Sequence, residues 1–192
     1  MTVDVLRILS LPESALPPEL QLQVTRLEEQ EWPPEPAIPA HPHDPKLTPV
    51  AMLLMEGDRV LASLAILSKE IIHAGQRFKA SGLSAVVTDH TLRKKGLGRR
   101  LVVAAKNAIR ASGADLGIFT CDEPLMGFYE SAGWQVLPRT VLVGGTPKDP
   151  LPSDLFAKVA MGSFFTDHAK HHAADFVGAR VELYSGEIDR LW

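Results

Sequence analysis

Two glycines inside a basic segment constrain this sequence more than any other feature. Residues 92–109 read LRKKGLGRRLVVAAKNAI, so Gly96 and Gly98 stand directly ahead of an apolar run with helical spacing. The residues before them, 81–89, include a nearly continuous apolar run, which favours a buried strand. The sequence therefore predicts a strand, a glycine-containing turn and a helix in immediate succession.

This turn has the features of an anion site. Glycines let the backbone approach a ligand closely, and the first N–H groups of a helix have no internal partner. Together with the helix dipole, these donors suit a pyrophosphate. Four basic side chains would add positive charge: Arg93, Lys94, Lys95 and Arg99. Because the pattern is neither G-x-G-x-x-G nor a Walker sequence, this segment alone leaves a solvated basic helix start open as the alternative.

Composition limits the partners of this basic segment. The chain has 192 residues and a formal net charge of -3, which argues against a general nucleic-acid binder. The single cysteine, Cys121, allows no disulfide within the chain and favours a reducing, cytoplasmic location. We find neither a signal peptide nor an apolar run that could span a bilayer. We therefore expect no nucleic-acid partner and no membrane partner.

Apolar periodicity and turn residues predict the other elements. The expected helices cover 18–32, 101–112 and 124–133. The expected strands cover 3–9, two arms of a hairpin within 50–67, both sides of a turn at 74–76, and then 114–122, 134–144 and 154–161. The prolines of 33–49 favour a long loop. This order predicts an α/β (α+β mixed) class, with a mixed sheet flanked by helices.

Two motifs together resemble those of a known superfamily. Residues 84–105 are similar to its core motif, a strand followed by [QR]-x-x-G-x-[GA] and a helix, and residues 124–134 are similar to its second signature, F-Y-x-x-x-G-[FW]. On these motifs the sequence resembles the GNAT superfamily of N-acetyltransferases. The resemblance implies one domain over 1–192, with its core motif at 82–136 and a tail at 175–192. It also implies a mostly antiparallel mixed sheet that splays at the acyl-CoA site.

The same resemblance implies acetyl-CoA as co-substrate and no metal. The CoA pyrophosphate would lie on the backbone that follows Arg93, namely Lys94, Lys95, Gly96, Leu97, Gly98 and Arg99. Val86 would donate its N–H to the thioester carbonyl, with a register uncertainty of one residue. Val87 and Thr88 would lie beside the CoA, and Thr88 would meet its pantetheine arm. Tyr129 would be the general acid for the departing thiolate, with packing as its alternative role.

A narrower resemblance is to the aminoglycoside 2′-N-acetyltransferases, whose layout and acidic, Trp-ended tail are similar. In that family an acidic residue, at the position of Ser84 here, acts on the amine through water. Serine cannot serve as that base, so the role falls to water, another carboxylate or the chain's own C-terminus at Trp192, unless the substrate differs. Acids that would meet a polycationic acceptor are Asp44, Asp122, Glu123, Asp154, Glu187 and Asp189.

We accordingly expect an N-acetyltransferase that acetylates a primary amine of a small, cationic acceptor, with an aminoglycoside-like amine as one candidate. The substrate contacts would come from Ser84, Asp122, Asp154, Asp189 and Trp192. A non-catalytic acyl-CoA-binding module and an enzyme for protein amines remain the alternatives. The sequence leaves the oligomeric state open, a homodimer included.

The histidines and the cysteine are the remaining residues with potential metal-binding or nucleophilic chemistry. Two histidine groups stand out: His41 with His43, and His168 with His171 and His172. The second group has helical metal-ligand spacing, but without an H-E-x-x-H pattern a solvated helix is favoured over a metal site. For Cys121 we expect buried packing, because direct transfer needs no cysteine nucleophile.

Overall fold

A computed structural model describes residues 5–33 and 43–192 of the chain. Within these ranges, seven strands form one sheet. Across the sheet they lie in the order β1 (Leu6–Pro12), β2 (Val50–Glu56), β3 (Arg59–His73), β4 (Gln76–Thr88), β5 (Leu116–Asp122), β9 (Lys158–Phe164) and β6 (Gln135–Val136). Neighbouring strands are antiparallel, except that β4 and β5 are parallel. The predicted mixed α/β class is confirmed.

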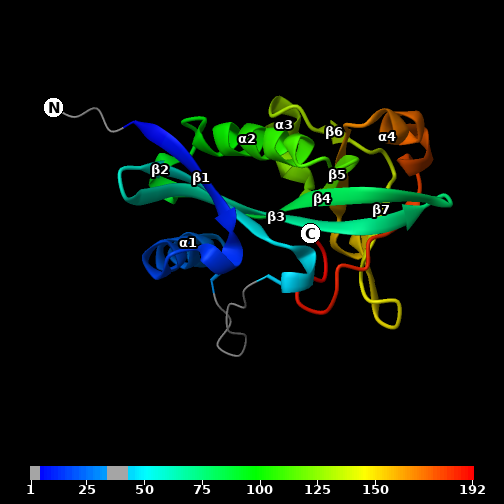
Figure 1. The fold of residues 1–192 in the computed structure, drawn as a ribbon, viewed down its shortest axis with the longest axis horizontal. Coiled ribbons are helices and arrows are strands. Elements are labelled where there is room, and N and C mark those ends of the chain that lie inside the picture. Colours follow the sequence, from blue (N-terminus) through cyan, green and yellow to red (C-terminus); the bar gives the residue numbers. More distant parts are fainter. Residues whose placement is uncertain (1–4, 34–42) are drawn as a thin grey trace.

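Helices cover the two faces of this sheet (Figure 1). Helix α1 (Pro18–Glu31) lies on one face, and α2 (Leu97–Ala111) and α3 (Met126–Ser131) lie on the other. The short α4 (Asp167–His171) lies near the far end of the β3–β4 hairpin. Helix α2 buries Leu101, Val102, Ala105 and Ile109, the spacing that places residues on one side of a helix.

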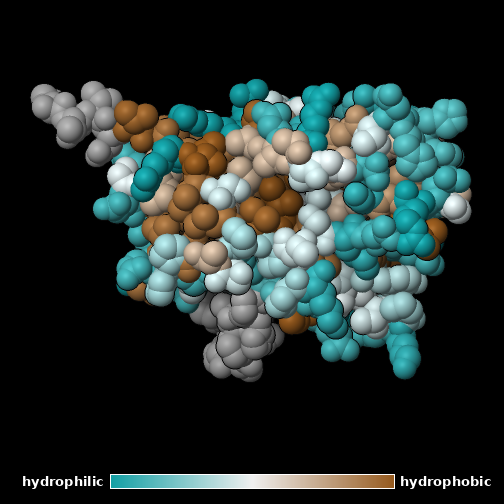
Figure 2. Space-filling view, in the orientation of Figure 1, coloured by the Kyte–Doolittle hydropathy of each residue, from teal (hydrophilic) through white to brown (hydrophobic). Residues whose placement is uncertain are grey.

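Strand alternation divides the core between the two faces. In β2, Leu53 and Met55 pack with the α1 side chains Val24 and Leu27, whereas Met52 belongs to the larger core on the α2 side. Successive residues of a strand point to opposite faces, so an unbroken apolar run serves both cores. Figure 2 shows hydrophobic residues gathered in the middle of one face and hydrophilic residues along most of its rim.

A second, smaller sheet lies beside the main one. It has the order β10 (Arg180–Glu182), β7 (Val141–Gly145) and β8 (Pro150–Pro152), with β10 parallel to β7. The C-terminal tail therefore docks as an edge strand, and it then runs back toward the centre of the main sheet (Figure 1). Each helix in the described ranges is too short or too polar to cross a membrane.

Most predicted elements lie near where the sequence placed them. The strand predicted at 134–144 is instead two strands, β6 in the main sheet and β7 in the smaller sheet, because Pro138 and Arg139 form a turn between them. The strand predicted at 154–161 begins only at Lys158, because Ser153–Phe156 form a 3-10 turn that Ala157 ends in a left-handed conformation, with φ of 52°. The first strand is Leu6–Pro12 rather than 3–9, and residues 1–4 lie outside the described part. Residues 34–42 of the proline-rich segment, His41 included, also lie outside it.

Candidate active site

A bulge in β4 lies at the centre of the candidate site. Two residues, Ala85 and Val86, face the single residue Leu64 of β3. Ala85 adopts a left-handed backbone, with φ of 49°. A bulge leaves its extra residue outside the regular ladder, so a backbone group there has no strand partner. The bulge coincides with Val86, where the family resemblance places the N–H for the thioester carbonyl.

Strands β4 and β5 separate soon after they meet. Their pairing in the described chain consists of Ala80 with Leu116 and Ser81 with Gly117. The wedge that follows is occupied in part by Trp192, whose side chain is almost fully buried. The splay expected of the sheet is therefore present, and the C-terminal residue lies in it.

The turn between β4 and α2 has the geometry of an anion cradle. Lys94 and Gly96 adopt left-handed backbones, with φ of 64° and 79°. The first main-chain bond of the helix runs from the N–H of Arg100 to the carbonyl oxygen of Gly96, over 3.0 Å. The N–H groups of the three residues between them have no acceptor inside the helix, so they can bind an anion.

Gly98 sets how closely this helix approaches the strand. A Cβ at Gly98 would lie 2.7 Å from the Oγ1 of Thr88, well inside van der Waals contact. A larger residue would have to displace the Thr88 side chain, so glycine lets α2 begin directly against the end of β4. This close approach brings the turn and the bulge of β4 to the same cavity.

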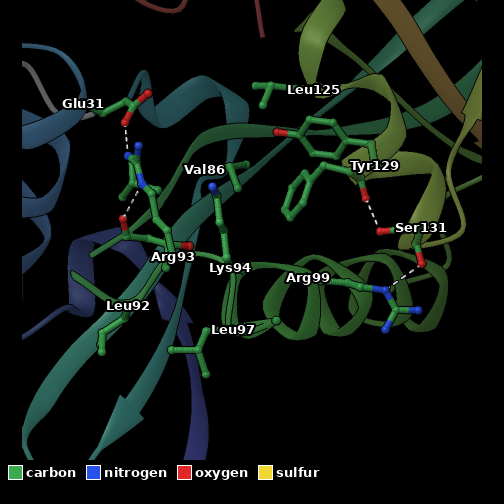
Figure 3. A pocket seen from close by; sticks show the side chains of 15 residues that line it. Glu31, Val86, Leu92, Arg93, Lys94, Leu97, Arg99, Leu125, Tyr129 and Ser131 are labelled. Atoms are coloured by element: carbon green, nitrogen blue, oxygen red, sulfur yellow. Dashed lines mark hydrogen bonds and ion pairs between the residues drawn. The ribbon is translucent and has the colours of Figure 1, made fainter. Parts of the chain in front are cut away.

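That cavity, which we call the donor cavity, has a volume of about 500 Å³ and is shown in Figure 3. It brings together most of the residues predicted to hold acetyl-CoA or to catalyse, namely Val86, Val87, Thr88, Arg93, Lys94, Gly96, Leu97, Gly98, Arg99 and Tyr129. Lys95 is exposed and is not part of the lining. The residues present fit an acyl-CoA: an anion cradle lies at one end and a bulged strand at the other.

Two of the predicted cations already have partners within the protein. Arg93 forms an ion pair with Glu31 of α1, and its Nε–H donates to the carbonyl oxygen of Thr88 over 3.4 Å. Arg99 donates its Nε–H to the carbonyl oxygen of Ser131 over 2.8 Å (Figure 3). The side chain of Lys94, which also lines the cavity, points into the donor cavity in Figure 3.

Tyr129 of α3 faces the donor cavity from the opposite side. Its side chain is only 6% exposed, and the rings of Phe119 and Phe128 each lie 4.9 Å from its ring centre. Burial raises the pKa of the phenol above its ordinary value, so Tyr129 holds its proton at neutral pH. In Figure 3 its hydroxyl points into the space between Val86 and Leu125.

A second cavity, which we call the acceptor cavity, has a volume of about 340 Å³. It brings together three of the five predicted substrate residues, Ser84, Asp122 and Trp192. The Oδ1 of Asp122 lies 2.7 Å from the Nζ of Lys158, in an ion pair on the cavity wall. The main-chain oxygen of Trp192 accepts a hydrogen bond from the N–H of Thr120 over 3.0 Å.

The donor and acceptor cavities meet at three residues. Val86, Leu125 and Tyr129 line both cavities, so the bulge of β4 and the phenol lie at the junction. A group bound in one cavity could therefore reach a group bound in the other beside a backbone N–H and a proton donor. This geometry suits group transfer between two ligands.

Cys121 lines the acceptor cavity but is not an activated nucleophile. Burial, together with the negative charge of the neighbouring Asp122, raises the pKa of its thiol to about 11. At neutral pH the group is therefore a thiol, which is a poor nucleophile. The expectation that Cys121 is a buried packing residue is confirmed by its burial.

The structure does not bring Asp154 and Asp189 to the acceptor cavity. The Oδ2 of Asp154 lies 3.6 Å from the Nη1 of Arg180, outside the cavity. Asp189 accepts a hydrogen bond from the backbone N–H of Asp44 over 2.7 Å. Neither carboxylate is among the residues that line the acceptor cavity, because Asp154 lies in the 3-10 turn before β9 and Asp189 lies in the tail after β10. Their role as substrate contacts stays a prediction.

Asp44, Glu123, Glu187 and the described histidines are not among the residues that line the donor or the acceptor cavity. Glu187 lines a small separate cavity. His43 lies between two carboxylates, 3.7 Å from Glu13 and 3.9 Å from Asp189. The ring of His168 stacks against Phe78, with 4.9 Å between ring centres. In the described part of the chain, no group of three or more His, Cys, Asp or Glu residues could hold a metal ion.

Sequence reasoning missed residues that other elements bring to the two cavities. The donor cavity also contains Glu31, Leu92, Leu125, Phe128 and Ser131. The acceptor cavity also contains Trp32, Leu151, Phe156, Lys158 and Leu191, among others. Most of these residues lie outside the two motifs. Phe128 stood beside Tyr129 in the second motif, and its position could have indicated its place in the cavity.

A family model agrees with this architecture. The model, described as an acetyltransferase (GNAT) domain, matches residues 40–137, about half of the chain. The matched part contains the bulged strand, the turn before α2 and Tyr129. Among curated proteins, none matches the sequence.

Solved structures share the fold at low sequence identity. The chain is similar to Escherichia coli ElaA, with 16% identity, a TM-score of 0.60, and coverage of 82% of this chain and 99% of that one. An acyl-CoA N-acyltransferase from Pseudomonas aeruginosa gives 17% identity, a TM-score of 0.58 and the same coverage. An aminoglycoside acetyltransferase from an uncultured soil metagenomic sample gives 20% identity and a TM-score of 0.53, with coverage of 66% and 86%.

Proposed function

Because the chain belongs to the GNAT acetyltransferase family, we propose that it transfers an acetyl group from acetyl-CoA directly to a primary amine of a small acceptor. The observation that carries this proposal is the junction of the two cavities at Val86 and Tyr129. Acetyl-CoA would lie in the donor cavity and the amine in the acceptor cavity. The thioester would then lie beside the bulge of β4.

In the proposed reaction the amine nitrogen attacks the thioester carbonyl carbon and the carbon–sulfur bond breaks. The N–H of Val86 would stabilise the negative charge that develops on the carbonyl oxygen. Tyr129 would donate its proton to the departing sulfur and later regain one from solvent. The raised pKa of Tyr129 keeps this proton in place until thiolate charge develops.

The turn before α2 would hold the pyrophosphate of acetyl-CoA. The supporting observations are the left-handed residues Lys94 and Gly96, the N–H groups without helix acceptors, and the close packing at Gly98. Lys94 adds a positive charge inside the donor cavity. Arg93 and Arg99 would act chiefly by holding the cavity walls, since their guanidinium groups bond Glu31 and Ser131.

The proton of the acceptor amine needs a destination. Ser84 lines the acceptor cavity at the position where the resemblance places an acid, and a hydroxyl is no base at neutral pH. Asp122 is paired with Lys158. We propose that the amine binds in its neutral form and that, after the attack, its nitrogen releases a proton to water, which favours an amine of modest basicity.

The test is an assay that contains acetyl-CoA and a panel of primary amines, with release of the CoA thiol as the readout and mass spectrometry of the acetylated amine as the second measurement. The proposal expects an acetylated product and an equal amount of free thiol. Calorimetric binding of acetyl-CoA without turnover on any amine would instead identify a non-catalytic acyl-CoA-binding module.

A further inference from the structure

The geometry points to an acceptor that carries a single primary amine on an apolar body about the size of an aromatic ring. This inference rests on the proposed function, since it names the substrate class of the same site. It differs from the polycationic, aminoglycoside-like acceptor that the tail resemblance suggested. Three features of the acceptor cavity carry it: its rim, its charge and its size.

The rim of the acceptor cavity is apolar and exposed. Trp32 at the end of α1 is 54% exposed, Phe156 after β8 is 51% exposed, and Leu125 before α3 is 44% exposed. A single exposed apolar residue needs no explanation. Three large ones from separate segments around one cavity form a surface that an apolar ligand would cover.

The charge of the cavity argues against a polycation. Asp122 is the acidic side chain among the described lining residues, and the ammonium of Lys158 lies 2.7 Å from it. These two charges pair with each other, and the main-chain oxygen of Trp192 on the same wall already accepts hydrogen bonds from Thr120, so a second ammonium on the ligand would find no unpaired carboxylate side chain there. Moving such a group from water into an unpaired, apolar site is costly. A monoamine gives up only one ammonium charge, and it must give up that charge in any case to become the neutral nucleophile.

The size of the cavity fits the same class. Its volume of about 340 Å³ lies at the lower end of the range for small-molecule sites, roughly 300–1,000 Å³. Its inner end carries the reacting groups, Val86 and Tyr129, beside the hydroxyls of Ser84 and Thr120. An amine that reaches this end would leave its apolar body between Trp32 and Phe156.

The first experiment compares two matched acceptors, 2-phenylethylamine and 1,4-diaminobutane, at saturating acetyl-CoA. We expect kcat/KM for phenylethylamine to exceed that for the diamine at least tenfold. Phe156→Ala and Trp32→Ala should each raise the KM for phenylethylamine about tenfold and leave the KM for acetyl-CoA unchanged. Leu155→Ala is the matched control, because Leu155 is 70% exposed beside Phe156 and does not line the cavity.

A charge variant tests the second argument separately. Lys158→Gln leaves the carboxylate of Asp122 without its cation, so it should shift the ratio of kcat/KM for the diamine to kcat/KM for phenylethylamine several-fold toward the diamine. A companion variant, Asp122→Asn, should lower kcat/KM for the diamine below that of the native protein. Circular dichroism of each variant checks that the fold is retained.

The outcomes separate this inference from the proposed function. Equal or faster acetylation of the diamine, with no effect of the rim variants, would overturn the apolar monoamine and leave acetyl transfer standing. If no amine is acetylated, the proposed acetyl transfer is refuted. Calorimetry of phenylethylamine with the CoA-saturated protein then tests whether the acceptor cavity binds an apolar monoamine. Binding that Phe156→Ala weakens would support it, and no binding would overturn it.

Discussion

The indole nitrogen of Trp192 donates a hydrogen bond to the carbonyl oxygen of Ile118 over 3.0 Å. Ile118 lies in β5 just beyond the point where pairing with β4 ends. The C-terminal residue therefore satisfies a backbone group that a continuous sheet would have bonded to the neighbouring strand. Through this bond the tail helps to hold the splay between β4 and β5, and Trp192 lines the acceptor cavity at the same time.

Gly82→Ala should displace Trp192 from this wedge. A Cβ at Gly82 would lie 2.5 Å from the carbonyl oxygen of Ile118 and 2.7 Å from the indole nitrogen. Overpacking of this kind typically costs about 1–3 kcal/mol, so the free energy of unfolding should fall by that amount in urea titrations. Gly127→Ala is the control, since a Cβ there meets no atom within 4 Å. Equal stability of the two variants would contradict the wedge.

Lys94→Asn should weaken the binding of acetyl-CoA, because Lys94 places a charge inside the donor cavity. Asparagine tolerates the left-handed backbone of this position, so the fold should persist. We expect the calorimetric Kd to rise about fivefold, since a partly exposed contact to phosphate contributes on the order of 1 kcal/mol. Lys95→Asn, at an exposed residue outside the lining, should leave the Kd unchanged.

Tyr129→Phe should lower kcat by roughly 10²–10⁴, the range usual for acid–base groups. The ring remains, so the packing against Phe119 and the affinity for acetyl-CoA should change little. The measurement is steady-state kinetics alongside calorimetry. Tyr184→Phe removes the other phenol of the chain, away from both cavities, and should keep the full rate. If Tyr129→Phe were equally fast, packing would be its only role.

Cys121 should react slowly with iodoacetamide at neutral pH. Burial raises the pKa of its thiol to about 11, so only about one molecule in 10⁴ carries the thiolate at pH 7. The rate of alkylation should rise about tenfold for each pH unit up to the point where the protein unfolds. Cys121→Ala should retain acetyl transfer. If the folded variant lost acetyl transfer, a covalent route through the Cys121 thiol would be indicated.

Glu28 should make the protein less stable as the pH rises through neutrality. Burial, with the carboxylate of Glu13 as the smaller cause, raises the pKa of Glu28 from 4.5 to about 7. The folded state therefore binds the proton more tightly than the unfolded state, so this stabilisation is complete below pH 4.5 and is lost as the pH passes 7. After allowance for partial exposure, the loss between pH 5 and pH 8 is about 1–3 kcal/mol.

The matched variant for this prediction is Glu28→Gln, which cannot ionise. Its free energy of unfolding, measured in urea at pH 5 and pH 8, should change less between the two values than that of the native protein. Glu19→Gln, at an exposed position of the same helix, should keep the native pH dependence. A native pH dependence in Glu28→Gln would place the titrating group elsewhere.

The sequence by itself determined the local elements that form the donor side of the candidate site. Gly96 and Gly98 predicted the turn, because only glycine fits a left-handed backbone without strain and allows close packing. The resemblance to the GNAT motifs predicted that this turn and Tyr129 belong to one site, and helix α2 and strand β5 lie between them. Alternation and helical periodicity predicted α1, the hairpins and the mixed sheet, because both patterns follow from backbone geometry.

Only the tertiary structure decided which distant residues complete the site. Trp32 and Phe156 form the rim of the acceptor cavity, yet they lie more than a hundred positions apart and belong to no motif. Nor does the sequence show that Lys158 pairs with Asp122, or that Asp189 turns away to bond Asp44. Such contacts depend on how β9 and the tail pack against the main sheet, and a pattern of neighbouring residues does not encode them. The charge and apolarity of the acceptor cavity therefore follow from packing, whereas the anion cradle follows from the sequence.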